Sequence, residues 1–184
     1  VALSANKEIL TYTEGSVDTV MEFHTMKIPR GGEYVLVLSD GTTVYLNAES
    51  ELTYPVKFSG KDRRVCLKGE AYFEVERDTC KPFIVEANSL EIQVLGTEFG
   101  VRAYGDEECV RTTLKKGKVS VESEGCGVIL TPNMQASFDK KTSQMDVREV
   151  NVDLFLGWKD GRLIFDNCSL EDILKDLGKW YDFD

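Results

Sequence analysis

The side chains best able to do chemistry in this chain are carboxylates. Glu70, Glu74 and Glu76 fall at alternate positions of one predicted strand, and Glu107 and Glu108 share a predicted turn. Two carboxyl groups on either side of a sugar form the catalytic pair of most glycosidases. Exposed carboxylates are, however, the usual state of Asp and Glu in an acidic protein. We therefore interpret these residues as a solvated strand face.

Other reactive groups are sparse. His24 is the only histidine, which excludes a histidine cluster for a metal, and its sequence neighbours do not supply a nucleophile together with an orienting acid. The glycines stand singly or in pairs at predicted strand ends and not in a loop that leads into a helix, so no phosphate site is indicated. We predict no catalytic residue, no metal site, no cofactor and no enzymatic activity.

The cysteines have no metal-binding or redox spacing. Five of them are scattered without a Cys-x-x-Cys pair, at Cys66, Cys80, Cys109, Cys126 and Cys168. We interpret them as reduced, partly buried small residues. One disulfide in an oxidising compartment is the alternative.

Composition narrows the class of protein. The 184 residues are 42% hydrophobic, which is enough for one domain with a core of its own or for one domain plus a small appendage. The net charge of −10 argues against a grip on nucleic acid or on an anionic membrane surface. No apolar run is long enough to span a bilayer, and the N-terminus lacks the charged start and apolar block of a signal peptide. A protein partner or a neutral ligand fits better.

Alternating apolar residues from Gly69 to Tyr104 predict four consecutive strands. Each strand has one dry face, formed by Ala71, Phe73 and Val75, then Phe83, Val85 and Ala87, then Leu90, Ile92 and Val94, then Phe99, Val101 and Ala103. Asp40-Gly41 between two apolar runs predicts a hairpin, although a solenoid would use the same residues as a corner. Further short strands follow up to Phe138, and no helix is evident before residue 150. We predict a mainly β fold, either β-solenoid-like or a sandwich.

The pattern changes after Val150. Arg162–Phe165 predicts a short strand, and Ser169 with Asp172 three residues later predicts a capped helix start. An apolar stripe at helical spacing follows, formed by Leu170, Ile173, Leu174, Leu177 and Tyr181. Residues 181–183 look ready to begin another strand. The segment is thus expected to be a small, incomplete β-α-β unit.

Apolar residues are dense in this last segment, and two roles are open for them. They form the core of the β-α-β unit or an exposed patch that meets another protein. On the second interpretation the partner-binding residues are Trp158, Phe165, Leu170, Trp180, Tyr181 and Phe183.

Several motifs in order resemble the FecR domain. They are Pro29–Tyr34, Leu38–Ala48, Leu52–Pro55, Phe58–Gly60, Leu67–Val75, Lys81–Val85 and Leu95–Val101. The tail from Gly161 to Tyr181 resembles the smaller domain that follows it in anti-sigma factors of this type. The combined series is specific, although no single motif is.

The resemblance implies the periplasmic part of a single-pass inner-membrane anti-sigma factor of a Gram-negative bacterium. Its partner would be the N-terminal signalling domain of a TonB-dependent outer-membrane transporter. The sigma factor, of the extracytoplasmic-function class, would be held by a cytoplasmic segment absent from this chain. The expected fold is a solenoid-like all-β part followed by a domain like the secretin and TonB short N-terminal domain.

On this basis three regions are expected. Residues 1–26 are a leading segment after a removed membrane anchor, residues 27–148 are the FecR-like all-β domain, and residues 149–184 are the partial C-terminal α+β domain. The alternative function is a periplasmic or surface domain that binds or cleaves carbohydrate. Tyr45 and Tyr72 would be its stacking platform, and Glu70 and Glu74 its polar contacts.

Overall fold

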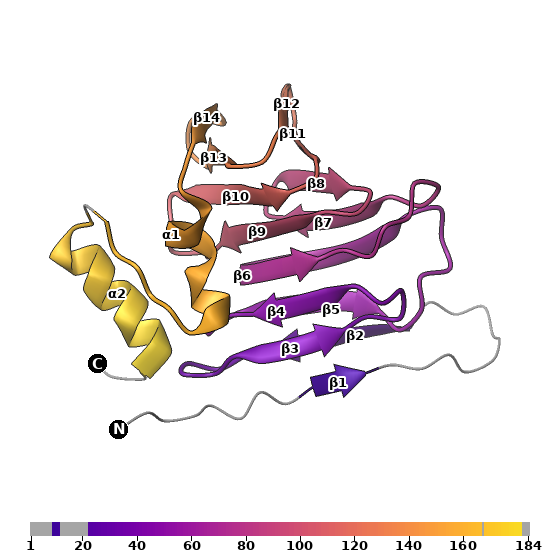
Figure 1. Ribbon diagram of the computed structural model, residues 1–184, viewed down its shortest axis with the longest axis horizontal. Helices are drawn as coiled ribbons and strands as arrows, with labels where there is room; N and C mark the ends of the chain where they lie inside the picture. The colour runs from indigo at the N-terminus through magenta and orange to yellow at the C-terminus, as the bar shows by residue number, and fades with distance from the viewer. Residues whose placement is uncertain (1–8, 12–21, 167, 182–184) are drawn as a thin grey trace.

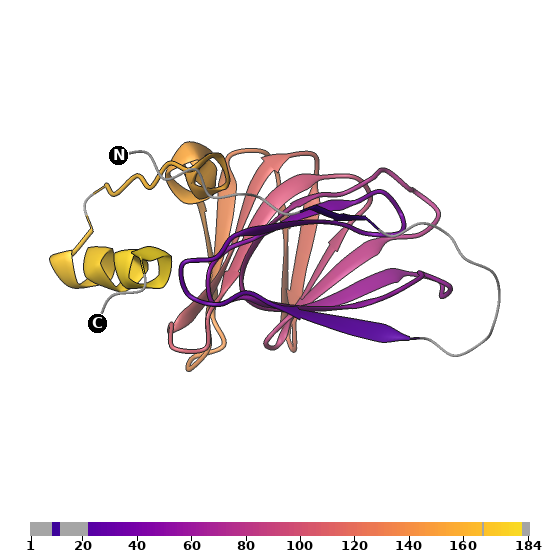
Figure 2. The same cartoon turned by 90° about the horizontal axis from the view of Figure 1, so that it is seen from below.

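The computed structural model describes residues 9–11, 22–166 and 168–181, which form two facing β-sheets and a helical C-terminal part (Figure 1, Figure 2). The first sheet has the order β1-β3-β4-β6-β9-β10-β13-β14, and the second has the order β2-β5-β6-β7-β8-β11-β12. The strands of the N-terminal half are β1 (Ile9–Thr11), β2 (Phe23–Lys27), β3 (Tyr34–Val37), β4 (Thr43–Leu46), β5 (Glu51–Pro55), β6 (Arg63–Glu74) and β7 (Phe83–Ala87). Those that follow are β8 (Leu90–Val94), β9 (Glu98–Ala103), β10 (Cys109–Lys116), β11 (Val119–Ser123), β12 (Cys126–Leu130), β13 (Met134–Asp139) and β14 (Met145–Glu149).

The chain adds hairpins to the two sheets in turn. The hairpin β3–β4 belongs to the first sheet, β7–β8 to the second, β9–β10 to the first, β11–β12 to the second and β13–β14 to the first. The colour in Figure 1 therefore climbs steadily from indigo to orange across the stack of strands. The layers are those of a sandwich, while the progress of the chain is that of a solenoid, so each of the two predicted architectures describes part of the fold.

The hairpin predicted at Asp40-Gly41 is confirmed. β3 and β4 pair antiparallel, and the Gly41 N–H donates to the Leu38 carbonyl at 3.0 Å. Gly41 has φ 88°, a left-handed conformation that costs glycine little. The Asp40 carboxylate accepts from the Thr42 N–H at 3.1 Å and so fixes the turn.

The core lies between the sheets and contains the predicted dry faces. All twelve alternating residues from Ala71 to Ala103 are among the buried side chains of this core. Phe73 stacks on Phe99 with ring centroids 5.2 Å apart and also contacts Phe83. The period of two therefore predicted these strands and their inward faces correctly.

The long strand β6 joins the two sheets. Its first part, Arg63–Cys66, pairs with β7 in the second sheet, and its last part, Gly69–Glu74, pairs with β9 in the first sheet. Gly69, at the start of the second part, has φ 90°. A Cβ at this position would lie 2.5 Å from Ser50 Oγ and 2.7 Å from Ser50 Cα. The passage between the sheets therefore requires glycine on two counts, its backbone conformation and its lack of a side chain.

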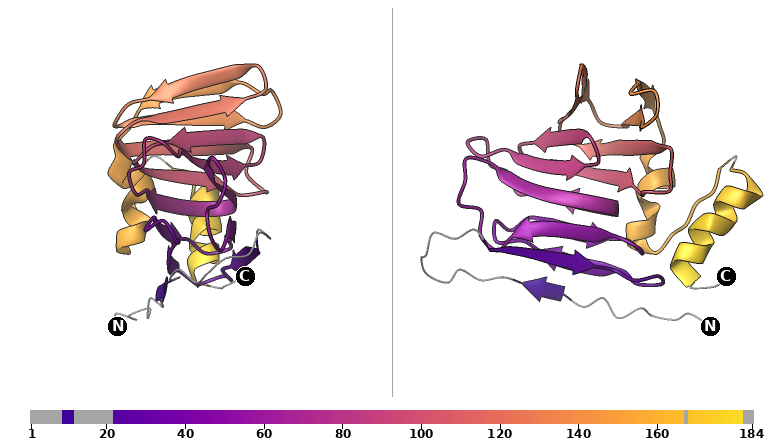
Figure 3. Two further views of the ribbon diagram at one scale, coloured as in Figure 1. Left: turned by 90° about the vertical axis from the view of Figure 1, so that its right-hand side faces the viewer. Right: turned by 180° about the vertical axis from the view of Figure 1, so that it is seen from behind.

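The C-terminal part contains α1 (Val152–Leu156), the 3-10 helix η1 (Gly157–Asp160) and α2 (Leu170–Tyr181). α2 matches the predicted helix, whereas α1 and η1 were not foreseen. The strand predicted at Arg162–Phe165 is wrong, because these residues run as irregular chain between η1 and α2 (Figure 3). No strand pairing includes them among the described residues, so their β-forming sequence has no ladder to join. Phe183 lies outside the described residues.

Ser169 caps α2 as its sequence predicts. The Asp172 N–H donates to Ser169 Oγ at 3.1 Å, and Ser169 Oγ donates to the Asp172 carboxylate at 2.7 Å. We expect Ser169→Ala to lower the stability of α2 by about 1 kcal/mol, because the first turn loses its acceptor. Hydrogen exchange of the α2 amides measures this loss. Protection factors equal to those of the wild type would contradict the capping role.

Candidate functional site

The C-terminal helices cover the outer face of the first sheet. Leu156 of α1 packs against Gly100 of β9, where any side chain would collide with it. Tyr72, Leu156 and Trp158 form a second, smaller hydrophobic cluster, with Tyr72 fully buried. The face of β6 opposite the core is therefore covered by protein.

Glu70 and Arg102 form the centre of the site. They are directly opposite each other in the register of β6 and β9, which places both side chains on the outer face. Arg102 Nη1 lies 3.2 Å from Glu70 Oε2, and the Asn47 amide donates to the same oxygen at 2.8 Å. Glu70 is only 6% exposed. The prediction that Glu70 lies on a solvated strand face is therefore wrong. The alternation of residues shows which side chains share a face of the strand, but not whether other parts of the chain cover that face.

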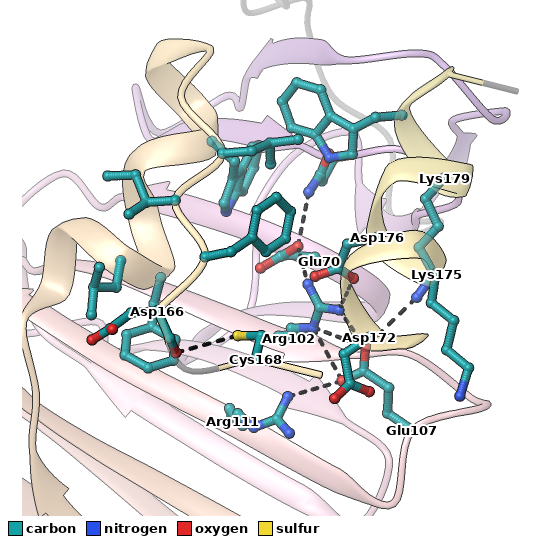
Figure 4. A pocket seen from close by; sticks show the side chains of 18 of the residues that line it. Glu70, Arg102, Glu107, Arg111, Asp166, Cys168, Asp172, Lys175, Asp176 and Lys179 are labelled. Carbon is teal, nitrogen blue, oxygen red and sulfur yellow. Dashed lines mark hydrogen bonds and ion pairs between the residues drawn. The ribbon is translucent and has the colours of Figure 1, made fainter. Parts of the chain in front are cut away.

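Arg102 also binds carboxylates from two other segments. Its Nε donates to Glu107 Oε1 at 2.9 Å, and its Nη2 lies 2.5 Å from Asp176 Oδ1 of α2. Figure 4 shows the guanidinium of Arg102 surrounded by these acids. We call Glu70, Arg102, Glu107, Asp176 and Lys179 the ionic cluster.

Lys179 is the member of the cluster that attaches the last turn of α2. Its Nζ lies 3.6 Å from Glu107 Oε1 and 3.7 Å from the centre of the Tyr104 ring. Its main-chain carbonyl accepts from the Gly31 N–H, in the turn between β2 and β3, at 2.8 Å. Lys179 is the most buried residue of α2. The helix therefore docks on the sandwich through its charged face.

Burial and ion pairing act in opposite directions within the cluster. Burial raises the pKa of Glu70 above its usual range, despite the opposing effects of Arg102 and Asn47. Burial also acts to raise the pKa of Glu107, but hydrogen bonding to Arg102 and the nearby charges of Arg102, Arg111 and Lys179 outweigh it and leave that pKa lowered. Arg102 and Asn47 thus limit the rise in the pKa of Glu70 that burial causes.

The apolar stripe of α2 faces away from this contact. Leu170 is 70% exposed, Leu174 49% and Tyr181 66%. We call these three residues the α2 stripe. Ile173 and Leu177, which complete the pattern in the sequence, are half-buried. The helix therefore presents to the solvent the side chains that an amphipathic helix usually buries.

The candidate partner-binding residues occupy different places. Trp158 is buried, Phe165 and Trp180 are half-buried, and all three line one cavity between the sandwich and α2. Leu170 and Tyr181 lie outside that cavity, on the α2 stripe. The structure therefore splits the predicted patch into an inner group and an outer group, with Phe183 outside the described residues.

The sequence did not indicate that Arg102 and Lys179 belong to the site. Arg102 stands at an ordinary outward position of a strand, and Lys179 at an ordinary polar position of a helix. The one available signal was the opposition of Glu70 and Arg102, which requires the register of β6 and β9 to be known.

The comparison with known families decides the identity. The family described as FecR protein matches residues 24–123 of the chain, which include strands β3 to β11 and all of β2 except its first residue. The chain belongs to the FecR family. This family is a regulatory, non-enzymatic kind of protein.

Solved structures similar to this FecR-family chain include two crystal structures of a candidate anti-sigma factor from Parabacteroides distasonis ATCC 8503. One is 30% identical with a TM-score of 0.83, and the similarity covers 88% of this chain and 76% of that protein. The other is 31% identical with a TM-score of 0.82, covering 86% of this chain and 75% of that protein. A comparison with curated proteins found no match.

The carbohydrate platform considered for this FecR-family chain is absent. Tyr72 is fully buried, and the Lys159 ammonium lies 5.1 Å from its ring centre and 5.7 Å from that of Tyr45. The Glu70 carboxylate is already in an ion pair with Arg102. The aromatic face that was to stack on a sugar is therefore covered by η1.

The described residues contain neither a metal-binding cluster nor a membrane-spanning helix. No group of three or more His, Cys, Asp or Glu side chains there is placed to hold a metal ion. The five cysteines are free thiols. The described helices include none with the length and apolar character needed to cross a bilayer.

Proposed function

We propose that this FecR-family chain is the signal-receiving part of a transmembrane anti-sigma factor and acts in the periplasm. The family match and the solved relatives support a signalling anti-sigma role. The chain would receive the state of a TonB-dependent outer-membrane transporter by binding that transporter's N-terminal signalling domain. It would pass the signal through a single inner-membrane helix to an extracytoplasmic-function sigma factor.

The observation that carries this proposal is the α2 stripe. Leu170, Leu174 and Tyr181 are large apolar side chains that stay exposed on a helix whose charged face is already docked. Exposed apolar surface of this kind on a folded domain is typical of a protein interface. We further propose that α2 belongs to a small domain similar to the secretin and TonB short N-terminal domain, and that this domain contacts the transporter.

The test is to measure binding of the transporter's N-terminal domain to the full periplasmic region by calorimetry. We expect Leu170→Gln combined with Leu174→Gln to weaken binding at least ~10-fold, because central apolar anchors contribute about 2 kcal/mol or more each. Glu171→Gln is the matched control, because Glu171 is an exposed residue of the same helix turn. We expect this control to bind within about twofold of the wild type.

Two outcomes would contradict the role of the stripe. One is an unchanged dissociation constant for the double variant. The other is a large fall in its melting temperature, which would mean that the stripe belongs to the regulator's own core. No binding by the wild type would remove the transporter as partner and leave the anti-sigma role to be tested by its effect on transcription.

A further inference from the structure

The two sheets end in free edge strands at one end of the sandwich. Among the described residues, β12 pairs only with β11 and β14 pairs only with β13. Figure 1 shows both strands at the end of the stack away from β1 and β2. The C-terminal helices lie elsewhere, since α1 packs against β9 of the first sheet and the last turn of α2 accepts a hydrogen bond from Gly31 beside β3.

These two edge strands differ in charge. β14 contains Asp146, Arg148 and Glu149, whereas β12, Cys126–Leu130, contains no charged residue. β12 also pairs with β11 in an unbroken register, without a bulge. Charged residues and bulges are the usual means by which an edge strand is kept from pairing with another chain. The charges of β14 therefore protect it against such pairing, and β12 has no such protection.

The backbone of β12 offers hydrogen-bonding groups at this edge. The turn Glu124-Gly125 closes on the pair Ser123 and Cys126, and the residues that close such a short hairpin exchange both backbone hydrogen bonds. The bonding direction alternates along a strand, so the N–H and C=O groups of Gly127 and Ile129 point away from β11. Neither residue has another backbone hydrogen bond in the described part of the chain. A further strand can therefore pair with both of them.

The side chains of β12 are complementary to a second copy of the same strand. Ile129 is 62% exposed on the outer face of the second sheet, and Gly127, on the same face, has no side chain. In an antiparallel pair centred on Val128, Ile129 of each copy lies opposite Gly127 of the other, where there is room for it. Cys126 and Val128 point inward, pack against the core and are only half-buried. The second copy would cover these two side chains as well.

We propose that β12 is a self-association site, which pairs antiparallel with β12 of a second copy about a twofold axis at Val128. Gly127 and Ile129 exchange backbone hydrogen bonds with Ile129 and Gly127 of the second copy. The net charge of −10 makes two copies repel each other over most of their surface, so contact is favoured where charge is absent. The site shares no residue with the α2 stripe, so its test is independent of the transporter contact.

Sedimentation equilibrium of the full chain, from micromolar to millimolar concentration, tests this contact. A stable interface buries about 1,200–2,000 Å² in total, and one short strand on each copy supplies less. We therefore expect monomers at low concentration and an average mass that rises toward that of two copies at high concentration. Hydrogen exchange locates the contact. The amides of Gly127 and Ile129 should exchange at least ~10-fold more slowly at the high concentration, because they become ladder donors.

Variants of Ile129 separate strand pairing from non-specific association. Ile129→Lys places a charge on the edge and should weaken association at least ~10-fold. Gln93→Lys is the matched control, because Gln93 is an exposed residue on the same face of the second sheet and gains the same charge. We expect this control to associate within about threefold of the wild type. Ile129→Pro removes an edge donor without removing a bond to β11, so it should also prevent pairing. Equal association of the two lysine variants would contradict the site.

Three further results would overturn the proposal. The first is the mass of a single copy at every concentration. The second is slow exchange of Gly127 and Ile129 that does not change with concentration, since another part of the same molecule would then cover β12. The third is association that slows exchange in β14 in place of β12. Because mass and exchange are both measured in the unmodified protein, these results do not depend on whether the variants fold.

Discussion

Arg102→Ala is expected to lower the free energy of unfolding by about 3–5 kcal/mol, because it leaves a buried carboxylate without its countercharge. Glu70 is 6% exposed, and its remaining described side-chain partner is the neutral amide of Asn47. Asp176 of α2 loses the same guanidinium, so α2 should detach in part. Urea denaturation measures the first effect, and faster hydrogen exchange of the Gly31 amide measures the second.

Two variants serve as references for Arg102. Arg111→Ala removes one partly exposed ion pair with Glu107 and should cost less than about 1 kcal/mol. Glu70→Gln in the Arg102→Ala background should recover at least about 1 kcal/mol, since the unpaired charge is then absent. If Arg102→Ala and Arg111→Ala denature alike, the cluster does not stabilise the fold as described.

The loss in free energy of unfolding caused by Arg102→Ala should also depend on pH. The folded-state pKa of Glu70 is already raised by burial, and loss of Arg102 raises it further. A carboxyl whose pKa is raised on folding binds its proton more tightly in the folded state, so stability falls as pH rises from the unfolded pKa through the folded pKa. The variant should thus be closest to the wild type in acid and furthest from it above the folded pKa of Glu70.

Gly69→Ala is the second substitution with a large expected effect, a loss of roughly 2–6 kcal/mol. A left-handed backbone costs a residue with a Cβ about 1–3 kcal/mol, and forcing a methyl group into packed structure adds about 1–3 kcal/mol. The new Cβ would lie 2.5 Å from Ser50 Oγ, where β6 passes between the sheets. Thermal and urea denaturation measure the loss.

Gly125 provides the matched control for Gly69. It also has a positive φ, 86°, but nothing lies within 4 Å of a Cβ built on it. Gly125→Ala therefore isolates the conformational cost, about 1–2 kcal/mol. Equal losses at the two glycines would show that the collision with Ser50 is relieved without cost.

The alternation of apolar and polar residues was sufficient to predict the strands of the sandwich. It was not sufficient to predict which charged residues form the site. The alternation of Phe73 and its neighbours predicted strands and inward faces, because a strand's two faces are fixed by its own residues. The surroundings of Glu70 include Arg102 and, through it, Asp176 of α2, which come much later in the chain. The contact of Arg102 with Asp176 spans 74 residues, and no local rule connects them.

The apolar stripe of α2 gave the wrong expectation for which face of the helix is buried. An apolar stripe normally packs inward, but here Lys179 is buried while Leu174 is 49% exposed. The acids and Tyr104 on the sandwich make the charged face of the helix the better complement to that surface. The strand expected at Arg162–Phe165 failed for a related reason, since β-propensity needs a neighbouring strand to act on.

The hydrogen bond from Gly31 to Lys179 makes a short mechanical path through the molecule. A tension applied to α2 reaches the turn between β2 and β3 directly, without crossing the stacked hairpins that separate the two in sequence. The load also passes through Arg102 to β9, and from there to β6, which belongs to both sheets. A pull on this one helix is therefore shared between an early turn and the strand that holds the layers together.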